Sequence, residues 1–236
     1  MTSASELSQA EFEQQFCAAL SAEVSPSEAA AHARHAWLVA ARNQTMNLTR
    51  IVEPRAMAVR HVLDSLAALP IIARRHPGAA RILDLGTGAG WPGLALAIAR
   101  PELRVTLLDA TRKKVQFLEE IVRELGLAAR VECVWGRCET HLESSRANYD
   151  CVVARAVAPI AQLLEWTEGG ALQSFVFWKG DALDDELREA APLLQRLRLE
   201  VVERVTYVLP DQPAERFLVV IGRAEKIKNR ASHSTA

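Results

Sequence analysis

Three alternating glycines follow a short apolar run near the middle of the chain. Gly86, Gly88 and Gly90 come directly after residues 81–85, and an apolar helical pattern begins after Pro92. Glycine lets the backbone adopt positive φ in a tight turn and lets a ligand lie directly against the main chain. A strand, a glycine turn and a helix in this order form the first unit of a nucleotide-binding α/β domain.

Two acidic residues frame this loop. Asp84 precedes the first glycine by two positions, and Asp109 ends the next apolar run, residues 104–109. An acid about 20 residues beyond the glycines accepts hydrogen bonds from ribose hydroxyls. The alternative for Asp109 is structural, in which its carboxylate caps the helix that starts at Thr111.

The glycine spacing distinguishes between two cofactors. A dinucleotide-binding loop has the pattern G-x-G-x-x-G/A, and its third small residue allows the helix to pack closely on the strand. That position is Trp91 here, which is too large. With Asp84 before it and Asp109 after the next strand, the loop instead resembles the first motif of S-adenosylmethionine-dependent methyltransferases, and the resemblance implies that cofactor.

Basic residues follow four of the five predicted parallel strands, at the end of the sheet where α/β domains bind ligands. We expect them to form a rim for an anionic substrate, and the phosphates of RNA fit. The alternative is a solvated charged surface without a ligand. These residues are Arg112, Lys113, Lys114, Arg137, Arg155 and Lys179.

The position after the fourth predicted strand narrows the chemistry. Methyltransferases that modify exocyclic amino groups resemble one another in an Asn/Asp-Pro-Pro-aromatic motif there, and methylation of pyrimidine C5 needs a cysteine nucleophile. This chain has Arg155 there, and no Pro-Cys motif. The guanidinium can bind a purine O6/N7 edge, a phosphate or the carboxylate of the cofactor. The alternative is a surface ion pair with Glu139 or Glu168.

A histidine, an aspartate and a serine also occur close together, as His61, Asp64 and Ser65. They share one face of a predicted helix. Their side chains therefore point outward together and do not converge as a Ser-His-Asp relay requires. We expect His61 and Asp64 to link the helical N-terminal region to the domain that carries the glycine loop.

Seven segments together resemble one family, and they span roughly residues 37–222 in the family's order. They are similar to the bacterial small-subunit ribosomal RNA guanine-N7 methyltransferases, also called glucose-inhibited division protein B. The resemblance implies methyl transfer from S-adenosylmethionine to N7 of a guanine in 16S ribosomal RNA or the small ribosomal subunit. The segments are 47–49, 60–65, 84–93, 107–109, 113–118, 155–156 and 179–180.

The motifs and the resemblance together assign roles to individual residues. Arg155 and Lys179 are expected to be catalytic. The expected cofactor-binding residues are Asp84, Gly86, Gly88, Trp91, Asp109, Cys138, Glu139 and Arg155. The expected substrate-binding residues are Asn47, His61, Arg112, Lys113, Arg137 and Lys179.

The implied chemistry needs no general base. Guanine N7 carries an unprotonated lone pair at neutral pH, so the enzyme has mainly to align the reacting atoms and exclude water. Two other functions stay open: a methyltransferase for another substrate, and a non-catalytic ribosome-associated module on the same fold.

Composition sets outer limits on these interpretations. The chain has 236 residues, half of them hydrophobic, and a net charge of −1, which excludes global disorder and leaves only local basic patches for RNA. The cysteines form no C-x-x-C pair, and Cys133, Cys138 and His141 lack a fourth ligand, so we expect reduced thiols and no metal. No apolar run looks long enough to cross a membrane. We therefore expect a cytoplasmic monomer.

The elements that must position these residues alternate after residue 81. Strands are predicted at 81–85, 104–109, 130–135, 149–154 and 172–178, and helices at 92–100, 111–125, 159–167 and 183–197. This alternation indicates a parallel sheet with helices on both faces. Runs 200–208 and 216–222 have no helix between them, which predicts an antiparallel hairpin at the sheet edge.

The predicted class is α/β, a Rossmann-like S-adenosylmethionine-dependent methyltransferase fold. Its sheet is mostly parallel and seven-stranded with an antiparallel edge strand. We expect an N-terminal helical extension at 1–75, the methyltransferase domain at 76–224 and a flexible polar tail at 225–236. Capping-box patterns begin two helices of the extension, at Ser8 and Ser25, and a loop is expected at 43–49.

Overall fold

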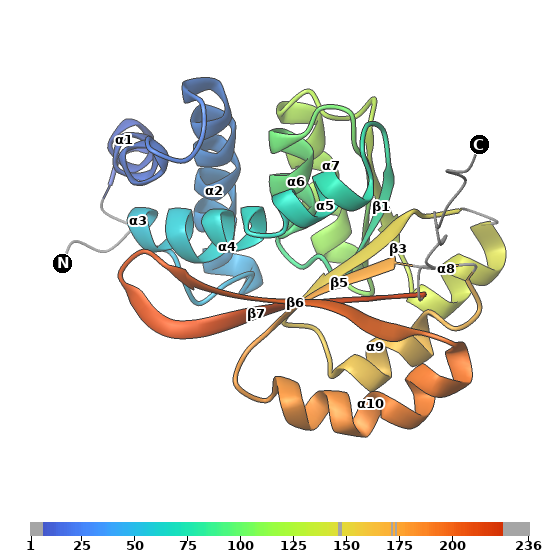
Figure 1. The fold of residues 1–236 in the computed structure, drawn as a ribbon. Helices are drawn as coiled ribbons and strands as arrows, with labels where there is room; N and C mark the ends of the chain where they lie inside the picture. The colour runs from blue at the N-terminus through green and yellow to red at the C-terminus, as the bar shows by residue number, and fades with distance from the viewer. Residues whose placement is uncertain (1–6, 146–147, 171, 173, 224–236) are drawn as a thin grey trace, which may run out of the picture.

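The computed structural model describes residues 7–145, 148–170, 172 and 174–223. The predicted polar tail at 225–236 lies outside the described residues. One sheet runs through the molecule, with helices packed on both of its faces (Figure 1).

The sheet has seven strands in the order β3-β2-β1-β4-β5-β7-β6. The first five strands are parallel, whereas β7 runs antiparallel to both β5 and β6. This confirms the predicted fold class. The strands are β1 (Arg81–Leu85), β2 (Arg104–Asp109), β3 (Val131–Trp135), β4 (Cys151–Arg155), β5 (Ser174–Lys179), β6 (Glu200–Leu209) and β7 (Gln212–Gly222).

Two hydrophobic cores lie on the two faces of the sheet, because successive side chains of a strand point to opposite faces. Ile82 belongs to the core under α6 (Gly93–Ala99) and α7 (Arg112–Glu124). Leu83 and Leu85 belong to the other core. The helices on that second face are α8 (Cys138–Ser145), α9 (Ile160–Trp166) and α10 (Leu183–Leu197).

Helix α8 was missing from the sequence prediction. Its buried apolar side chains are few, chiefly Cys138 and Leu142, so its segment carries little helical periodicity. The β6–β7 turn is also tighter than expected. Only Pro210 and Asp211 separate the two strands, and Asp211 adopts a left-handed φ of 59° that a two-residue hairpin turn accepts.

The N-terminal region contains helices α1 (Gln9–Leu20) and α2 (Pro26–Met46). Both capping boxes are present, which confirms the prediction at Ser8 and Ser25. Helix α2 continues to Met46, so the expected loop starts late, at Asn47. The left-handed backbone of Asn47, with φ 49°, ends the helix.

A continuous helical segment, 54–75, connects this region to β1. It consists of α3 (Pro54–Met57), the π-helical turn η1 (Ala58–Leu63), α4 (Asp64–Leu66) and α5 (Leu69–Arg75). Its 22 residues are long and apolar enough to cross a membrane, which corrects the expectation from the sequence. Half of its most apolar window is buried inside the protein, as in a core helix.

Candidate active site

A cavity of about 260 Å³ opens at the carboxyl ends of strands β1 to β4. The strand order reverses between β1 and β4, and such a switch point is where open α/β sheets bind ligands. The lining is largely apolar, with the carboxylate of Asp109 at the end of β2 and the charged residues Arg137 and Glu139 after β3. It consists of Leu85, Gly86, Leu108, Asp109, Ala110, Gly136, Arg137, Cys138, Glu139, Ala156, Val157 and Trp166.

Gly86 forms the floor of this cavity, where the glycine loop turns away from β1. Its backbone N–H donates to the Leu108 carbonyl at 2.9 Å, and its φ of 70° lies in the left-handed region. A Cβ atom at this position would lie 2.8 Å from both methyl carbons of Val157. The close approach of Val157 and the positive φ both require glycine here.

Asp84 fixes the conformation of the glycine loop through hydrogen bonds. Its carboxylate is fully buried, and Oδ2 accepts hydrogen bonds from Thr87 Oγ1 at 2.6 Å and from the Gly93 backbone N–H at 2.7 Å. Burial raises the pKa of this carboxyl group to about 6. Asp84 does not line the cavity, and its hydrogen bonds connect the start of the loop to the start of α6.

Asp109 makes the capping contact that was the structural alternative, and it also lines the cavity. Its Oδ2 accepts a hydrogen bond from the Gly88 backbone N–H at 3.1 Å. Its Oδ1 accepts one from the Thr111 backbone N–H at 2.8 Å, at the start of α7. Gly88 itself lies behind this carboxylate and not in the cavity lining.

The loop after β3 and the first turn of α8 also contribute to the cavity wall. Arg137, Cys138 and Glu139, all expected to be ligand-binding residues, line the cavity. Burial raises the pKa of the Cys138 thiol to about 12, so this side chain is neutral and apolar in character. The sequence missed the apolar lining residues, such as Trp166, because they are indistinguishable from core residues in an apolar run.

Trp91 lies outside the cavity, clamped between two histidines. The His35 ring stacks on one side at 4.4 Å between ring centroids, and the His61 ring on the other at 4.3 Å. Burial lowers the pKa of His35 to about 4 and, together with the nearby Arg155 charge, that of His61 to about 3. His61 Nε2 lies 2.9 Å from Thr49 Oγ1. The structure therefore shows Trp91 and His61, expected to bind cofactor and substrate, in packing contacts within the protein.

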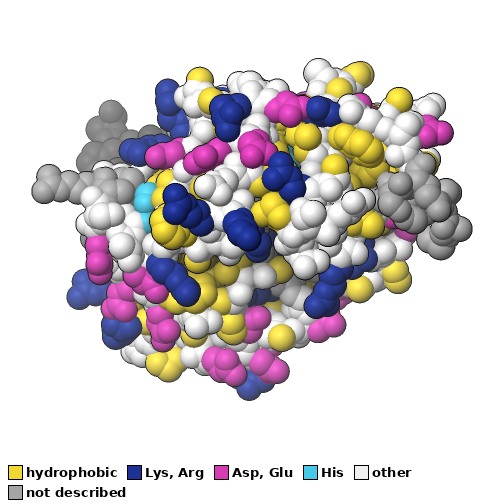
Figure 2. All heavy atoms as spheres, turned by 180° about the vertical axis from the view of Figure 1, so that it is seen from behind, with side chains coloured by type: hydrophobic (Ala, Val, Ile, Leu, Met, Phe, Trp, Pro, Cys, Tyr) yellow, Lys and Arg dark blue, Asp and Glu magenta, His cyan; other side chains and the backbone are white. Residues whose placement is uncertain are grey.

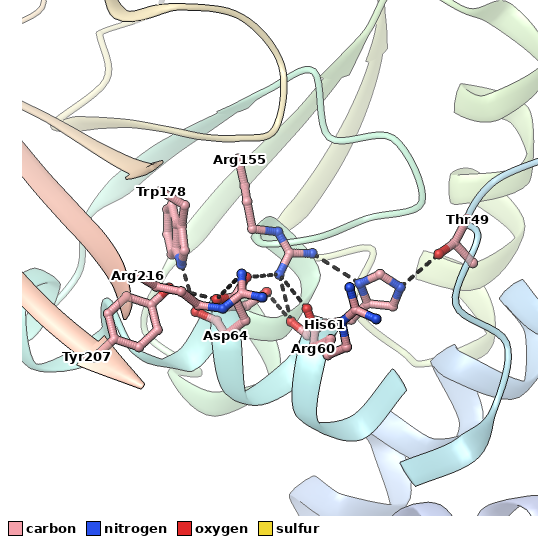
Figure 3. Close-up of polar contacts among 9 residues, drawn as sticks. Thr49, Arg60, His61, Asp64, Arg155, Trp178, Tyr207 and Arg216 are labelled. Atoms are coloured by element: carbon pink, nitrogen blue, oxygen red, sulfur yellow. Dashed lines mark hydrogen bonds and ion pairs between the residues drawn. The ribbon is translucent and has the colours of Figure 1, made fainter. Parts of the chain in front are cut away.

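Arg155 is held by the helical segment 54–75 (Figure 3). Its Nη1 donates to Asp64 Oδ2 at 2.8 Å and to the carbonyl oxygens of Arg60 and His61. The side chain of Arg155 is 12% exposed and that of Asp64 is 4% exposed. The alternative pairing with Glu139 or Glu168 is therefore wrong.

Asp64 is the centre of this network. Tyr207 donates its hydroxyl to Asp64 Oδ1 at 2.6 Å, and Arg216 approaches the same oxygen at 3.5 Å. The Trp178 indole N–H donates to the Asp64 carbonyl at 2.7 Å. The expected link between the helical extension and the sheet is present, and it also includes the β6–β7 hairpin, which the sequence did not indicate.

The predicted basic rim is smaller than expected. Lys179 donates to the Ala158 carbonyl at 2.8 Å and pairs with Glu186 at 2.7 Å, and its side chain is 8% exposed. Arg112, in contrast, is exposed, and its guanidinium lies 5.2 Å from the ring centroid of Trp135, itself 57% exposed. Exposed cations on the face in Figure 2 are interspersed with acidic side chains and form no continuous basic patch.

The remaining predicted ligands are not brought to the cavity. Asn47 is an exposed helix cap, and Lys113 is an exposed residue in the first turn of α7; neither lines the cavity. Among the described residues, no three His, Cys, Asp or Glu side chains are grouped as metal ligands would be.

The doubly wound sheet, the glycine loop after β1 and the carboxylate after β2 define a class, the Rossmann-like S-adenosylmethionine-dependent methyltransferases. The fold matches a solved O-methyltransferase from Bacillus cereus, in complex with SAH, with a TM-score of 0.56 at 17% identity over 80% of this chain and 91% of that one.

The comparisons of sequence are more specific. The family model described as rRNA small subunit methyltransferase G matches residues 29–215, and the chain belongs to this family. The ribosomal RNA small subunit methyltransferase G of Solibacter usitatus is 41% identical, covering 81% of this chain and 89% of the relative. Its counterpart in Desulforamulus reducens is 36% identical, covering 78% of this chain and 77% of the relative.

Proposed function

We propose that the protein transfers a methyl group from S-adenosylmethionine to N7 of a guanine in 16S ribosomal RNA. The observation that carries the cofactor assignment is the cavity at the switch point, floored by Gly86 and bordered by Asp109. The family membership of the chain, through residues 29–215, carries the assignment of the RNA.

The residues present fit this cofactor. The Asp109 carboxylate offers hydrogen-bond acceptors for ribose hydroxyls, while Leu108, Ala110 and Trp166 provide apolar surface for a purine ring. Gly86 presents bare backbone, and Arg137 and Glu139 offer charged groups at the mouth. When bound, S-adenosylmethionine supplies an electrophilic methyl carbon, whose bond to sulfur breaks as the bond to guanine N7 forms, the electron pair staying on sulfur.

The chain contributes position rather than proton transfer. Guanine N7 loses no proton in this reaction, and the nearby Arg155 and Lys179 are already engaged in ion pairs with Asp64 and Glu186. We assign Arg155 and Lys179 to fixing the loops after β4 and β5, which hold the reacting groups in line. The exposed Arg112, Lys113 and Arg137 are left to meet RNA phosphates.

Two measurements test this function. Calorimetric titration with S-adenosylmethionine should give saturable binding, and tritiated methyl transfer should label small ribosomal subunits from cells that lack the modification. Borohydride and aniline treatment should then cleave the labelled RNA at one guanine, because N7-methylguanosine is sensitive to it. The absence of cofactor binding would favour the non-catalytic module, and labelling without cleavage would place the methyl group on another atom.

We infer that the working form is a cytoplasmic monomer without a bound metal. In support, all four cysteines are free thiols, and the apolar helical segment 54–75 is half buried against the rest of the protein. Light scattering at assay concentrations and metal analysis of the purified protein test this assignment. A dimer mass, or stoichiometric metal, would contradict it.

A further inference from the structure

A second cavity, of about 570 Å³, adjoins the first. It lies between the loops that follow β4 and β5 and the β6–β7 hairpin, and it shares Ala156 and Val157 with the first cavity. A ligand in one cavity is therefore separated from a ligand in the other only by this short segment. The lining of the second cavity also includes Asp64, Arg155, Pro159, Trp178, Lys179, Asp181, Glu186, Tyr207, Glu215 and Arg216.

The charges of this second cavity favour a base over a phosphate. Its lining has three basic and four acidic side chains, and all three basic ones are paired with acids: Arg155 and Arg216 with Asp64, and Lys179 with Glu186. A phosphate would meet a net negative surface. A neutral base with hydrogen-bond donors, however, finds carboxylate acceptors, and the aromatic side chains of Trp178 and Tyr207 offer surface for its ring.

Among the acidic side chains of this cavity, Glu186 is held in a fixed orientation by two hydrogen-bond donors. Its Oε2 accepts from Lys179 Nζ at 2.7 Å and from the Ile160 backbone N–H at 2.9 Å, so the side chain is fixed from two directions. Within the described residues its Oε1 has no hydrogen-bond partner, and the side chain is 20% exposed at the cavity wall. A carboxylate held by one oxygen presents the other oxygen to a ligand at little entropic cost.

We propose that the second cavity receives the target guanine base and that Glu186 recognises its Watson–Crick edge. This inference rests on the proposed function. The N1–H and 2-amino groups of guanine are adjacent donors, and the Oε1 atom of Glu186 has two lone pairs with which to accept from them. They lie on the opposite edge of the purine from N7, so a base held by Glu186 directs N7 toward the first cavity.

The same contact assists the reaction. The lone pair of N7 forms the new bond to carbon, and the purine gains the positive charge that the sulfur loses. A carboxylate that accepts hydrogen bonds from the ring is attracted more strongly as this charge develops, so the contact is stronger in the transition state than in the ground state. Replacing Glu186 should therefore lower kcat as well as the affinity for RNA.

The test uses Glu186→Gln and the matched change Glu189→Gln, which removes the same charge from an exposed position one turn along α10. The glutamine oxygen can still accept from Lys179 and Ile160, while its amide nitrogen faces the base and repels N1–H. We expect methyl transfer to small subunits to fall about tenfold or more in kcat/KM. The affinity for S-adenosylmethionine should stay at the wild-type value, whereas the Tm should fall because Lys179, which is 8% exposed, loses its counter-charge. Glu189→Gln should behave as wild type in all three measurements.

A second measurement uses the wild-type protein and needs no variant. RNA with inosine at the methylated position lacks the 2-amino group, so we expect its kcat/KM to be about tenfold or more below that of the guanine RNA. In Glu186→Gln this preference should disappear. Equal rates on inosine and guanine RNA with the wild-type protein, or normal activity of Glu186→Gln, would overturn the assignment of Glu186. A wild-type protein that methylates neither RNA would instead overturn the proposed function.

Discussion

Gly86 shows how closely the cofactor loop depends on one residue. Its φ is positive, and the side chain of Val157 occupies the space that a Cβ atom would need. Backbone conformation and packing therefore exclude other residues independently, and both constraints act at the floor of the candidate cofactor cavity.

The substitution Gly86→Val should reduce the affinity for S-adenosylmethionine by more than about tenfold, because Val157 and the loop must move into the cavity. Calorimetry measures this loss. Gly126→Val is the matched control, since Gly126 also has positive φ but a Cβ atom there would meet no other atom within 4 Å. It should lose some stability and keep its cofactor affinity. Equal cofactor affinity in both variants would place the cofactor elsewhere.

The Asp64 carboxylate joins side chains from the fourth, sixth and seventh strands. It meets Arg155, Arg216 and Tyr207 in a setting where its own side chain is 4% exposed. Hydrogen bonding to this carboxylate and burial both raise the pKa of the Tyr207 hydroxyl, with burial the larger cause, so tyrosine remains a donor at all ordinary pH values.

Asp64→Asn should lower the free energy of unfolding by about 3–5 kcal/mol, because it leaves the buried Arg155 without its counter-charge. Urea denaturation at pH 7 measures the change. Asp184→Asn breaks an exposed pair with Arg204 and should leave stability almost unchanged. A similarly small effect of Asp64→Asn would mean that Asp64 does not link the helical region to the sheet.

At the scale of elements, three segments meet at one tryptophan. Helix α2 brings His35, the π-helical turn η1 brings His61, and the glycine loop brings Trp91 between them. His35 Nε2 also lies 2.8 Å from the Ala89 carbonyl of the loop. The helical region is thus packed directly on the glycine loop, and the two should lose order together.

Trp91→Ala should therefore cost about 3–5 kcal/mol of unfolding free energy, as for other large core residues, and should weaken cofactor binding. Denaturation with urea and calorimetry measure the two effects. Trp135→Ala removes the same side chain where it is 57% exposed and should be close to neutral for stability. If Trp91→Ala kept normal cofactor affinity despite its lower stability, the helical region would not support the loop.

At the scale of the whole molecule, buried histidines set the response to acid. Burial lowers the pKa of His32 to about 3, of His35 to about 4 and of His61 to about 3, each from 6.5. Below pH 6.5 these histidines bind protons in the unfolded chain but stay neutral in the folded chain. The stability that the neutral histidines contribute is therefore fully present above pH 6.5 and is lost as the pH falls toward 3. Asp84, with its pKa raised to about 6, acts in the opposite direction but is one group against three.

The free energy of unfolding should therefore decrease steeply between about pH 7 and pH 5. His32→Leu removes one of the three protons, so its loss over this interval should be smaller than that of the wild type by about 2 kcal/mol. Urea denaturation at pH 7 and pH 5 gives the change in unfolding free energy for each protein. Comparing these two changes does not depend on the absolute stability of the variant. The same pH dependence in the variant and the wild type would show that His32 is not buried as a neutral side chain.

The sequence by itself determined the succession of most strands and helices along the chain, and it located the glycine loop, because both depend on local patterns. Apolar runs with turn residues between them specify strands and helices, and Gly86 with Asp109 at a fixed spacing specifies a nucleotide-type site. The same local information identified the capping boxes at Ser8 and Ser25. It did not find α8, whose few buried residues leave no periodicity.

Only the tertiary structure decided the partners of the charged side chains. Asp64 and Arg155 are 91 positions apart, and Asp64 and Tyr207 are 143 apart, so no spacing in the sequence relates them. Residue type marked Arg155 and Lys179 as cations near the mouth, but it could not show that acids neutralise both. Nor could it place Glu186 at the wall of the second cavity. Pairing depends on which strand ends and loops meet in space, and the packing of the sheet, the hairpin and the helical segment 54–75 fixes that.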